Sequence, residues 1–314
     1  MKKIISGIQP SGILHLGNYF GAIKQFIELQ EENDCLFFVA NYHALTSSTN
    51  ADSLRKNTRD VVLDYLALGV DPKKASIFIQ SHVPIHTELM WVLSNLTPMS
   101  LLERGHSFKD KSARGISSNT GLFTYPVLMA ADILMYDVDM VPVGKDQKQH
   151  LEMTRDIATK FNEKYTEIFK LPEPMIVEST AVVPGVDGAK MSKSYGNTID
   201  MFAPKKILKK QVMSIVTDST PLEDPKDPDN NITTLYKLFA TPEKLEEMRE
   251  KFKAGNYGYG HAKKELLEAI LEYFSKARAK REELVANPEY VDKILAEGAE
   301  RARSIAKIKM IEVK

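Results

Sequence analysis

A glycine-rich stretch past the middle of the chain carries the strongest chemical signal. Residues 185–197 read GVDGAKMSKSYGN, and Lys190 and Lys193 stand three positions apart among serines. A stretch so rich in glycine does not form a rigid element, so its lysines can move. Mobile lysines suit negative charge that develops late in a reaction, such as that of a departing pyrophosphate. An unrelated exposed loop would rarely carry KMSKS in this order.

A second segment with phosphate-binding character lies near the N-terminus. The apolar run at residues 4–8 leads into GIQPSG, and a helical pattern begins near residues 17–19. Glycine and proline permit a tight turn, and a helix N-terminus offers free N–H groups and positive potential to phosphate. The segment is neither a Walker loop nor a dinucleotide fingerprint. A strand-to-helix turn without a ligand fits this segment equally well.

An acidic residue interrupts an otherwise apolar helical pattern. Asp132 lies within PVLMAADILMY at residues 126–136, where an unpaired carboxylate would be costly. Met129, three residues earlier, lies on the same helix face. A carboxylate only accepts hydrogen bonds and an indole N–H only donates, so the two are complementary in an apolar pocket. The alternative is a carboxylate paired with an internal donor.

The histidines and the single cysteine predict no metal site. His82 and His86 are four apart, but Pro84 and the strand pattern before it oppose one helix spanning both, and the remaining histidines have no zinc-like spacing. Cys35 excludes an internal disulfide and any cysteine cluster, and its apolar surroundings favour a core residue. His43, taken alone, fits a satisfied core histidine better than a ligand-binding one.

Short apolar runs alternate with helical patterns in the first part of the chain. The runs rich in Ile, Val and Phe predict strands at residues 4–8, 36–40, 76–80 and 140–143. Apolar residues at three- and four-residue spacing predict a helix that ends before Gly69. This rhythm predicts an α/β fold with a Rossmann-like, doubly wound parallel sheet, whose ligands bind at the carboxyl ends of the strands.

The pattern changes after Ser194. Residues 221–231 hold three prolines and three aspartates, which predicts a loop. Helical patterns follow, and Asn287 with Pro288 breaks them before a last helix near residues 290–310. We therefore expect a catalytic domain at 1–197 and an all-helical domain at 198–314, with a C-terminal helix that packs back.

Composition limits the possible partners. The 314 residues include 42 basic and 42 acidic side chains, so a polyanion would need local basic patches. A solvated helix face is the alternative for each patch. The candidate patches are Lys109, Lys111 and Arg114; Lys205, Lys206, Lys209 and Lys210; Lys276, Arg278, Lys280 and Arg281; and Arg301, Arg303, Lys307 and Lys309. No apolar run is long enough for a membrane span or a signal peptide, which predicts a cytoplasmic protein without a membrane partner.

With these segments in place, the chain resembles the class I aminoacyl-tRNA synthetases, which carry an N-terminal HIGH-type motif and a KMSKS loop. The HIGH-type motif here is HLGN at residues 15–18, with Asn18 in the fourth position. Asparagine keeps a donor and an acceptor for ribose or phosphate. The resemblance narrows to the bacterial tryptophanyl-tRNA synthetases and covers nearly the whole length. It is carried further by LMAADIL at 128–134, VPVGKDQ at 141–147 and TRDIA at 154–158.

The resemblance implies an ATP site. The matching positions are Gln9, Pro10, Ser11, Gly17, Asn18, Gly144, Lys145, Asp146, Val183, Lys190, Met191, Ser192, Lys193 and Ser194. His15, Lys111, Lys190 and Lys193 take the catalytic roles, acting on the phosphates and on the leaving pyrophosphate. Mg2+ would be carried by the triphosphate. Some relatives hold an iron–sulfur cluster on cysteines, which this chain lacks.

The resemblance also implies the amino acid and the partners. Asp132 would read the indole, with Met129 and His43 lining the pocket and Tyr125 and Gln147 near the substrate amino group. The reaction would activate L-tryptophan with ATP and transfer it to the 3′ end of its tRNA, with the anticodon read by the helical domain. The family is a homodimer, with an interface near residues 80–150.

Three alternatives stay open. A tyrosine-specific relative would read a phenol hydroxyl, and a site built for a substrate hydrogen bond strongly rejects an analogue that lacks it. A small-molecule nucleotidyltransferase would need neither KMSKS with a helical domain nor a tRNA. A regulator without turnover would be expected to lack His15, Lys190 or Lys193.

Overall fold

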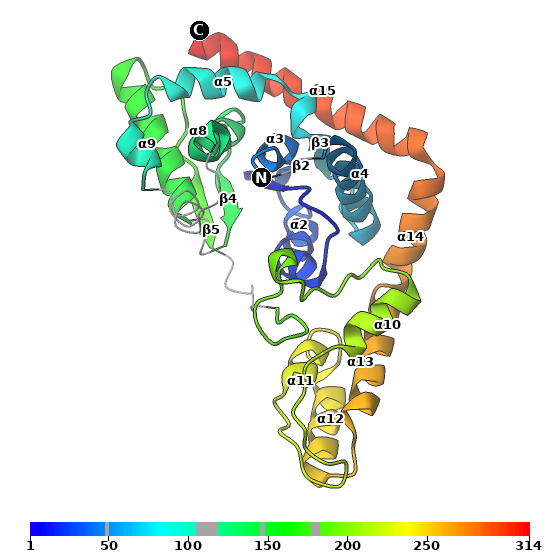
Figure 1. Ribbon diagram of the computed structural model, residues 1–314. Coiled ribbons are helices and arrows are strands. Elements are labelled where there is room, and N and C mark those ends of the chain that lie inside the picture. Colours follow the sequence, from blue (N-terminus) through cyan, green and yellow to red (C-terminus); the bar gives the residue numbers. More distant parts are fainter. Residues whose placement is uncertain (48–49, 105–118, 145–147, 177–182) are drawn as a thin grey trace. The chain divides into compact units, whose positions relative to one another are not determined.

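The chain forms a parallel α/β sheet and a helical part in this computed structural model (Figure 1). The structure describes residues 1–47, 50–104, 119–144, 148–176 and 183–314. The strand order is β3-β2-β1-β4-β5, and every pair is parallel. The strands are β1 Lys3–Ile8, β2 Asp34–Val39, β3 Ala75–Ile79, β4 Met140–Val143 and β5 Glu173–Ile176. This order confirms the predicted doubly wound, Rossmann-like class.

The sheet forms from nearly continuous apolar segments. Every residue of β3 is buried, and in β2 every residue after Asp34 is buried. Such runs are typical of parallel strands that are covered on both faces by helices. The four predicted strands are confirmed within two residues. The sequence did not predict β5, because EPMI is short and contains a proline.

The chain divides into two compact units. The sheet unit consists of residues 1–12, 26–178 and 284–314, and the helical unit consists of residues 13–25 and 179–283. The helices within the sheet unit are α3 Asn41–Ala44, α4 Ala51–Leu68, α5 Ile85–Ser94, α6 Met99–Leu102, α8 Thr120–Leu134, α9 Lys148–Lys164 and α15 Pro288–Val313, and a 3-10 turn spans Gln80–His82. Two further helices, α2 Lys24–Leu29 and α14 Ser275–Ala286, contain the sequence boundaries between the units. The domain boundary expected at residue 197 stays a prediction.

The C-terminal helix α15 packs on β3 (Figure 1). Gly298 permits this approach, since a Cβ atom there would lie 2.0 Å from the Ile77 carbonyl oxygen. Arg301 donates to Ser76 Oγ at 2.7 Å and to Asp34 at 2.6 Å. Arg301 of the C-terminal basic patch therefore stabilises the packing of α15 on the sheet. The sequence had suggested only a polyanion contact or a solvated helix face for this patch.

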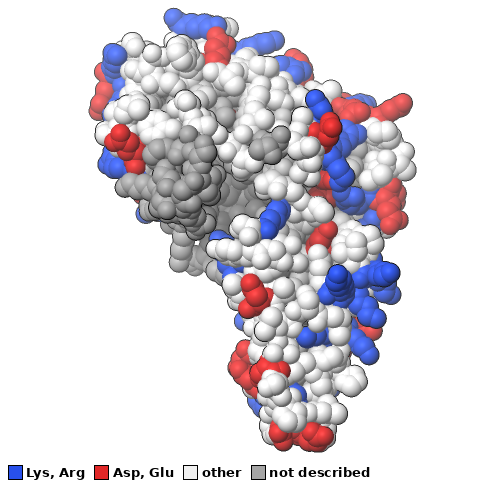
Figure 2. Space-filling view, in the orientation of Figure 1, with Lys and Arg blue, Asp and Glu red and all other residues white. Residues whose placement is uncertain are grey.

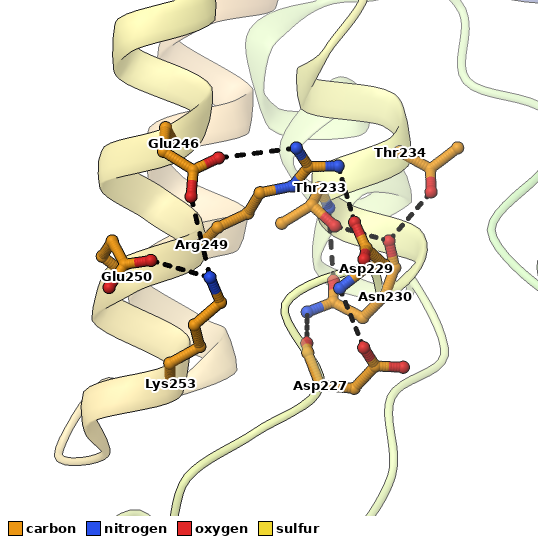
Figure 3. Close-up of polar contacts among 9 residues, drawn as sticks. All are labelled: Asp227, Asp229, Asn230, Thr233, Thr234, Glu246, Arg249, Glu250 and Lys253. Atoms are coloured by element: carbon orange, nitrogen blue, oxygen red, sulfur yellow. Dashed lines mark hydrogen bonds and ion pairs between the residues drawn. The ribbon is translucent and has the colours of Figure 1, made fainter.

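In its described residues, the helical unit begins with a continuous helical segment and continues through four further α-helices before α14. The first segment comprises α1 Leu16–Asn18 and a π-helical turn at Tyr19–Ile23; the others are α10 Lys205–Met213, α11 Asn231–Tyr236, α12 Pro242–Ala254 and α13 Tyr259–Tyr273. The side chain of Asn230 caps α11 by accepting from the N–H groups of Ile232 and Thr233. Arg249 on α12 reaches Asp229 at 2.6 Å, which ties that helix to the loop before α11 (Figure 3).

Local sequence signals set several element ends as predicted. Gly69 ends α4 in the left-handed conformation, with φ 114°. The loop expected at residues 221–231 extends to Asn230, where α11 is capped. Asn287 interrupts the helices as expected, and its side chain accepts from the Tyr290 N–H at the start of α15. None of the helices in the described ranges is long and apolar enough to span a membrane.

Candidate functional site

The carboxyl edge of the sheet gathers several of the predicted site residues. Gln9 follows β1 and Gly144 follows β4, the two central strands between which the strand order reverses. In doubly wound sheets, ligands bind outside the strand ends at this switch point. His43 follows β2 on the short helix α3, and Gln80 follows β3 directly. The fold therefore brings residues from four strand ends to one edge.

Asp132 on α8 is fully buried and accepts hydrogen bonds from three side chains. His43 Nε2 lies 2.8 Å from Oδ2, and Gln80 Nε2 lies 2.8 Å from each oxygen. His86 Nδ1 contacts Oδ1. Burial alone would raise the pKa of this carboxyl, but the hydrogen bonds from His43 and His86 lower it to about 2. Asp132 is therefore a carboxylate at any physiological pH.

The paired carboxylate keeps room for one more donor. The alternative interpretation of Asp132, a carboxylate paired with internal donors, fits these contacts. Two carboxylate oxygens offer about four lone-pair sites, and Gln80 places one N–H between both oxygens. The contacts of Asp132 are therefore compatible with an indole N–H as an additional donor.

Three supporting residues were missed by sequence reasoning: Gln80, His86 and Tyr136. Gln80 and His86 lie 52 and 46 positions from Asp132 in the chain, so no local pattern links them to it. The available signal was indirect, since a buried carboxylate demands donors from somewhere. The amide of Gln80 is itself oriented, because its Oε1 accepts from the Tyr42 N–H at 3.0 Å.

A second pair stands beside the carboxylate cluster. The hydroxyl of Tyr125 on α8 is hydrogen-bonded to His150 Nε2 on α9. The rings of Tyr125 and His43 meet edge to face, with centroids 6.2 Å apart. Met129 is half-buried on the same helix as Asp132. The structure thus brings four of the five residues predicted to bind the amino acid into one region of the sheet unit; Gln147, the fifth, lies outside the described residues.

In the helical unit, the HIGH-type motif and the KMSKS loop lie against each other. A Cβ atom on Gly17 would lie 3.0 Å from the His15 ring and 3.4 Å from Met191 Cβ. Asn18 Oδ1 accepts from the His15 N–H at 3.1 Å, which fixes the start of the helical segment. The two segments that the sequence predicts to bind phosphate therefore meet at Gly17.

His15 is buried and uncharged. Burial, and secondarily the positive charge of Lys193, lower the pKa of His15 from 6.5 to about 4. Its Nδ1 atom has no hydrogen-bond partner within the described part of the chain. A neutral imidazole with an open nitrogen next to a lysine is suited to contact a phosphate oxygen.

Asn197 holds the KMSKS loop in its conformation. Its Nδ2 donates to Asp187 Oδ1 at 2.8 Å and to the Lys190 carbonyl at 3.2 Å. Its Oδ1 accepts from the Ser192 N–H at 2.7 Å. A Cβ on Gly185 would lie 2.3 Å from the Asn197 side chain, so only glycine permits this contact. One buried amide thus connects both sides of the loop.

The remaining predicted residues divide between the units. Pro10 is buried and Ser11 exposed at the end of β1, whereas Ser192 and Ser194 hydrogen-bond each other at 2.8 Å in the helical unit. The Val183 carbonyl accepts from the Met191 N–H at 2.9 Å. Lys109, Lys111, Arg114, Lys145 and Asp146 lie outside the described residues.

Within the described ranges, no group of three or more His, Cys, Asp or Glu side chains is arranged to hold a metal ion. His82 and His86, rejected as a metal pair, lie on different elements, and His86 is instead hydrogen-bonded to Asp132 and Tyr136. The role of Mg2+ stays a prediction.

Comparison with known proteins gives one consistent family. Residues 1–275 match the family of tRNA synthetases class I (W and Y). The chain is 67% identical to the tryptophan–tRNA ligase of Fusobacterium nucleatum, over 98% of this chain and 94% of that protein. It is 54% identical to that of Rhodopirellula baltica, over 97% and 95%. The tryptophanyl-tRNA synthetase of Campylobacter jejuni, crystallised with ADP and tryptophan, superimposes with a TM-score of 0.95 at 52% identity, over 99% of this chain and 98% of that one.

Proposed function

Because the chain belongs to the class I tRNA synthetases of the tryptophan and tyrosine group, we propose that it is a tryptophan–tRNA ligase. It activates L-tryptophan with ATP and transfers the amino acid to the 3′ end of its tRNA. Identity to tryptophan–tRNA ligases over nearly the whole chain supports this activity. The structural observation that carries the choice of amino acid is Asp132, a buried, ionised carboxylate held by side-chain donors.

The reaction has two steps and needs no enzyme nucleophile. The tryptophan carboxylate attacks the α-phosphorus of ATP, a P–O bond forms, and pyrophosphate leaves with the electrons of the broken bond. A ribose hydroxyl of the tRNA then attacks the carbonyl of the adenylate, loses its proton and releases AMP. The protein contributes positioning and charge stabilisation.

The ATP contacts are assigned by resemblance and by position. Gln9, Pro10, Ser11 and Gly144 stand at the switch-point edge of the sheet and are proposed to contact the nucleotide there. Lys145 and Asp146, and Val183 of the helical unit, are proposed adenosine contacts by resemblance. In the helical unit, His15, Gly17, Asn18 and residues 190–194 are proposed to contact the phosphates. Lys190, Lys193 and Lys111 neutralise the charge that moves onto pyrophosphate. The nucleotide enters as its magnesium complex.

The amino acid is read through charge complementarity. Asp132 accepts the indole N–H, Met129 and His43 line the pocket, and Tyr125 and Gln147 contact the substrate amino group. Lowering of the Asp132 pKa to about 2 supports this role, because only the ionised form is purely an acceptor. Edge-to-face contact between His43 and Tyr125 supports a single pocket for both ends of the substrate.

The tRNA and a second subunit complete the proposed assembly. Lys205, Lys206, Lys209 and Lys210 lie on α10, and Figure 2 shows basic side chains gathered over that helix. These lysines, with Lys276 and Lys280 on α14, are proposed phosphate contacts whose affinity falls with added salt. Arg278 instead donates to the carbonyls of Met201 and Ala203, so it supports the fold.

We place the reaction in the cytoplasm and propose a homodimer with an interface near residues 80–150. Trp91 on α5 leaves 73% of its surface exposed, as expected of a side chain that a partner covers. Light scattering at working concentration tests this assembly, and a monomer would contradict it.

Pyrophosphate exchange with each aromatic amino acid tests the activity. The full-length protein, given ATP, Mg2+ and labelled pyrophosphate, should form labelled ATP with tryptophan and at least about a thousandfold more slowly with tyrosine or phenylalanine, since a site built for one donor rejects substrates that lack it. Exchange with tyrosine alone would show that the substrate is tyrosine, the other amino acid of this family. Exchange with none would contradict the ligase activity.

A further inference from the structure

We propose that Tyr136 and His86 are positioning residues for tryptophan recognition, acting through Asp132. This inference rests on the proposed function, because it takes Asp132 as the group that reads the indole N–H. Neither residue needs to touch the substrate. Their task is to fix the orientation of the carboxylate that does.

The three side chains form a hydrogen-bonded chain with defined proton positions. Asp132 only accepts, so His86 Nδ1 donates to it. The other ring nitrogen, Nε2, lies 2.5 Å from the Tyr136 hydroxyl. Burial raises the pKa of Tyr136 well above its ordinary value, so the hydroxyl keeps its proton. The Tyr136 hydroxyl therefore donates to Nε2, and His86 is the neutral tautomer with its proton on Nδ1.

A protonated His86 would not satisfy the same geometry. Both ring nitrogens would then donate, and the Tyr136 hydroxyl would have to accept. Its own proton would be left without a hydrogen-bond partner among the described residues, which is costly in a buried site. The neutral tautomer satisfies all four polar atoms along the chain.

The surroundings exclude water and hold the imidazole in place. Tyr136 and His86 are 0% exposed and Asp132 is 1% exposed. The rings of Phe38 and Phe78 each meet the His86 ring edge to face, with centroids 6.3 Å away. Because these groups are closed to solvent, removing the Tyr136 hydroxyl leaves Nε2 without its donor. The imidazole is then held by its Nδ1 hydrogen bond alone, so the ring can turn and its hydrogen bond to the carboxylate weakens.

That change would act on tryptophan and spare ATP. His86 contacts one oxygen of Asp132, and His43 contacts the other. Gln80 contacts both oxygens. Losing the His86 contact leaves the carboxylate held by His43 and Gln80 alone, so it can rotate away from the orientation that accepts the indole. None of the proposed ATP residues that the structure describes takes part in this chain of hydrogen bonds.

Tyr136→Phe in the full-length protein is the direct test, with pyrophosphate exchange as the assay. We expect the KM for tryptophan to rise about tenfold, the factor for loss of the His86 hydrogen bond to the charged Asp132 carboxylate. The KM for ATP should stay within about twofold. The second measurement is inhibition by a tryptophan analogue with sulfur in place of the indole nitrogen. Its inhibition constant should not change, because it has no N–H for Asp132 to accept.

Tyr65→Phe is the matched control. Tyr65 is also fully buried in the sheet unit, and its hydroxyl donates to the Phe38 carbonyl at 3.4 Å, outside the cluster. This variant should leave the KM for tryptophan and the analogue inhibition unchanged. Equal losses in both variants, or equal weakening of tryptophan and analogue by Tyr136→Phe, would mean a general packing role and would overturn the proposal.

A measurement on the unaltered protein tests the proposal even if the Tyr136→Phe variant does not fold. Nitrogen-15 NMR of labelled histidine should report His86 as the neutral tautomer protonated on Nδ1, and a proton on Nε2 would overturn the proposal. Absence of tryptophan-dependent exchange by the wild type would instead contradict the proposed function. Normal wild-type exchange with an unaffected Tyr136→Phe variant would overturn only the role of Tyr136 and His86.

Discussion

Gly298 on helix α15 lies so close to Ile77 on strand β3 that a Cβ atom would come within 2.0 Å of the Ile77 carbonyl oxygen. The obstacle is backbone, which cannot move aside as a flexible side chain would. The close packing of the last helix on the sheet therefore depends on one hydrogen atom in place of a methyl group.

Gly298→Ala should lower the free energy of unfolding by about 2–3 kcal/mol, the usual cost of forcing extra atoms into a packed site. Thermal and urea unfolding measure it. Gly260→Ala on α13 is the control, because nothing lies within 4 Å of the added Cβ; it should be neutral or slightly stabilising, since alanine favours helix over glycine. Equal stability of the two variants would contradict the close contact.

Asp132→Asn should raise the KM for tryptophan in pyrophosphate exchange by about 10- to 100-fold, with a small effect on the KM for ATP. The amide removes the charge and presents N–H groups to neighbours that already donate, namely His43, Gln80 and His86. Asp64→Asn on α4, another buried aspartate of the sheet unit, should leave the KM for tryptophan unchanged. An unaltered KM in Asp132→Asn would remove Asp132 from recognition.

Lys193→Ala should slow pyrophosphate exchange by about 100- to 1,000-fold, the range for losing a group that stabilises developing charge. Tryptophan binding, measured by fluorescence or calorimetry, should change less than about twofold, because the lysine acts on the phosphates. Lys237→Ala, an exposed lysine of the same unit, is the control. Exchange at the wild-type rate in Lys193→Ala would remove the loop from the mechanism.

The lowered pKa of His15 makes the protein sensitive to acid. Between pH 6.5 and about 4 the unfolded chain binds a proton at His15 that the folded protein does not, so stability is lost as the pH falls. His15 is expected to lower the free energy of unfolding by about 2 kcal/mol between pH 7 and pH 5. The His15→Gln variant should not show this contribution.

Urea unfolding of the wild type and of His15→Gln at both pH values gives the comparison. An NMR titration of His15 gives the pKa directly. A midpoint near 6.5 in the folded protein would contradict the burial and the influence of Lys193.

Asn197→Asp should slow pyrophosphate exchange by about tenfold and raise the KM for ATP. The new carboxylate loses the donor to the Lys190 carbonyl and stands against the Asp187 carboxylate, so the loop no longer keeps its conformation. Asn33→Asp is the control, since Asn33 also donates to a backbone carbonyl, that of Leu29 at 2.9 Å, but lies in the sheet unit. Equal exchange rates in the two variants would contradict the role of Asn197.

Much of the fold could be predicted because its signals are local. Apolar runs defined four strands, and Gly69 and Asn287 marked helix ends through their own backbone and side-chain chemistry. The strand β5 was missed because four residues with a proline give a weak pattern. The π-helical turn at 19–23 was missed because nothing in YFGAI distinguishes it from an ordinary helix.

The sequence predicted the candidate substrate-binding residues but not the residues that hold them in place. The unusual position of Asp132 in an apolar helix was visible in the sequence. Its donors Gln80 and His86 were not, because folding brings them together from separate strand ends and helices. The same applies to Arg301, which a charge count assigns to a basic patch but which bonds to Ser76 and Asp34.

The order of the segments along the chain has a consequence for synthesis on the ribosome. The sheet unit consists of residues 1–12, 26–178 and 284–314, so its last helix is translated after the whole of the 179–283 segment. Until α15 emerges, β3 lacks the helix that packs on it and the Ser76 hydroxyl lacks Arg301. An apolar surface of the sheet therefore stays exposed until α15 has been synthesised. Chaperone binding during translation should concentrate on nascent chains that end before α15.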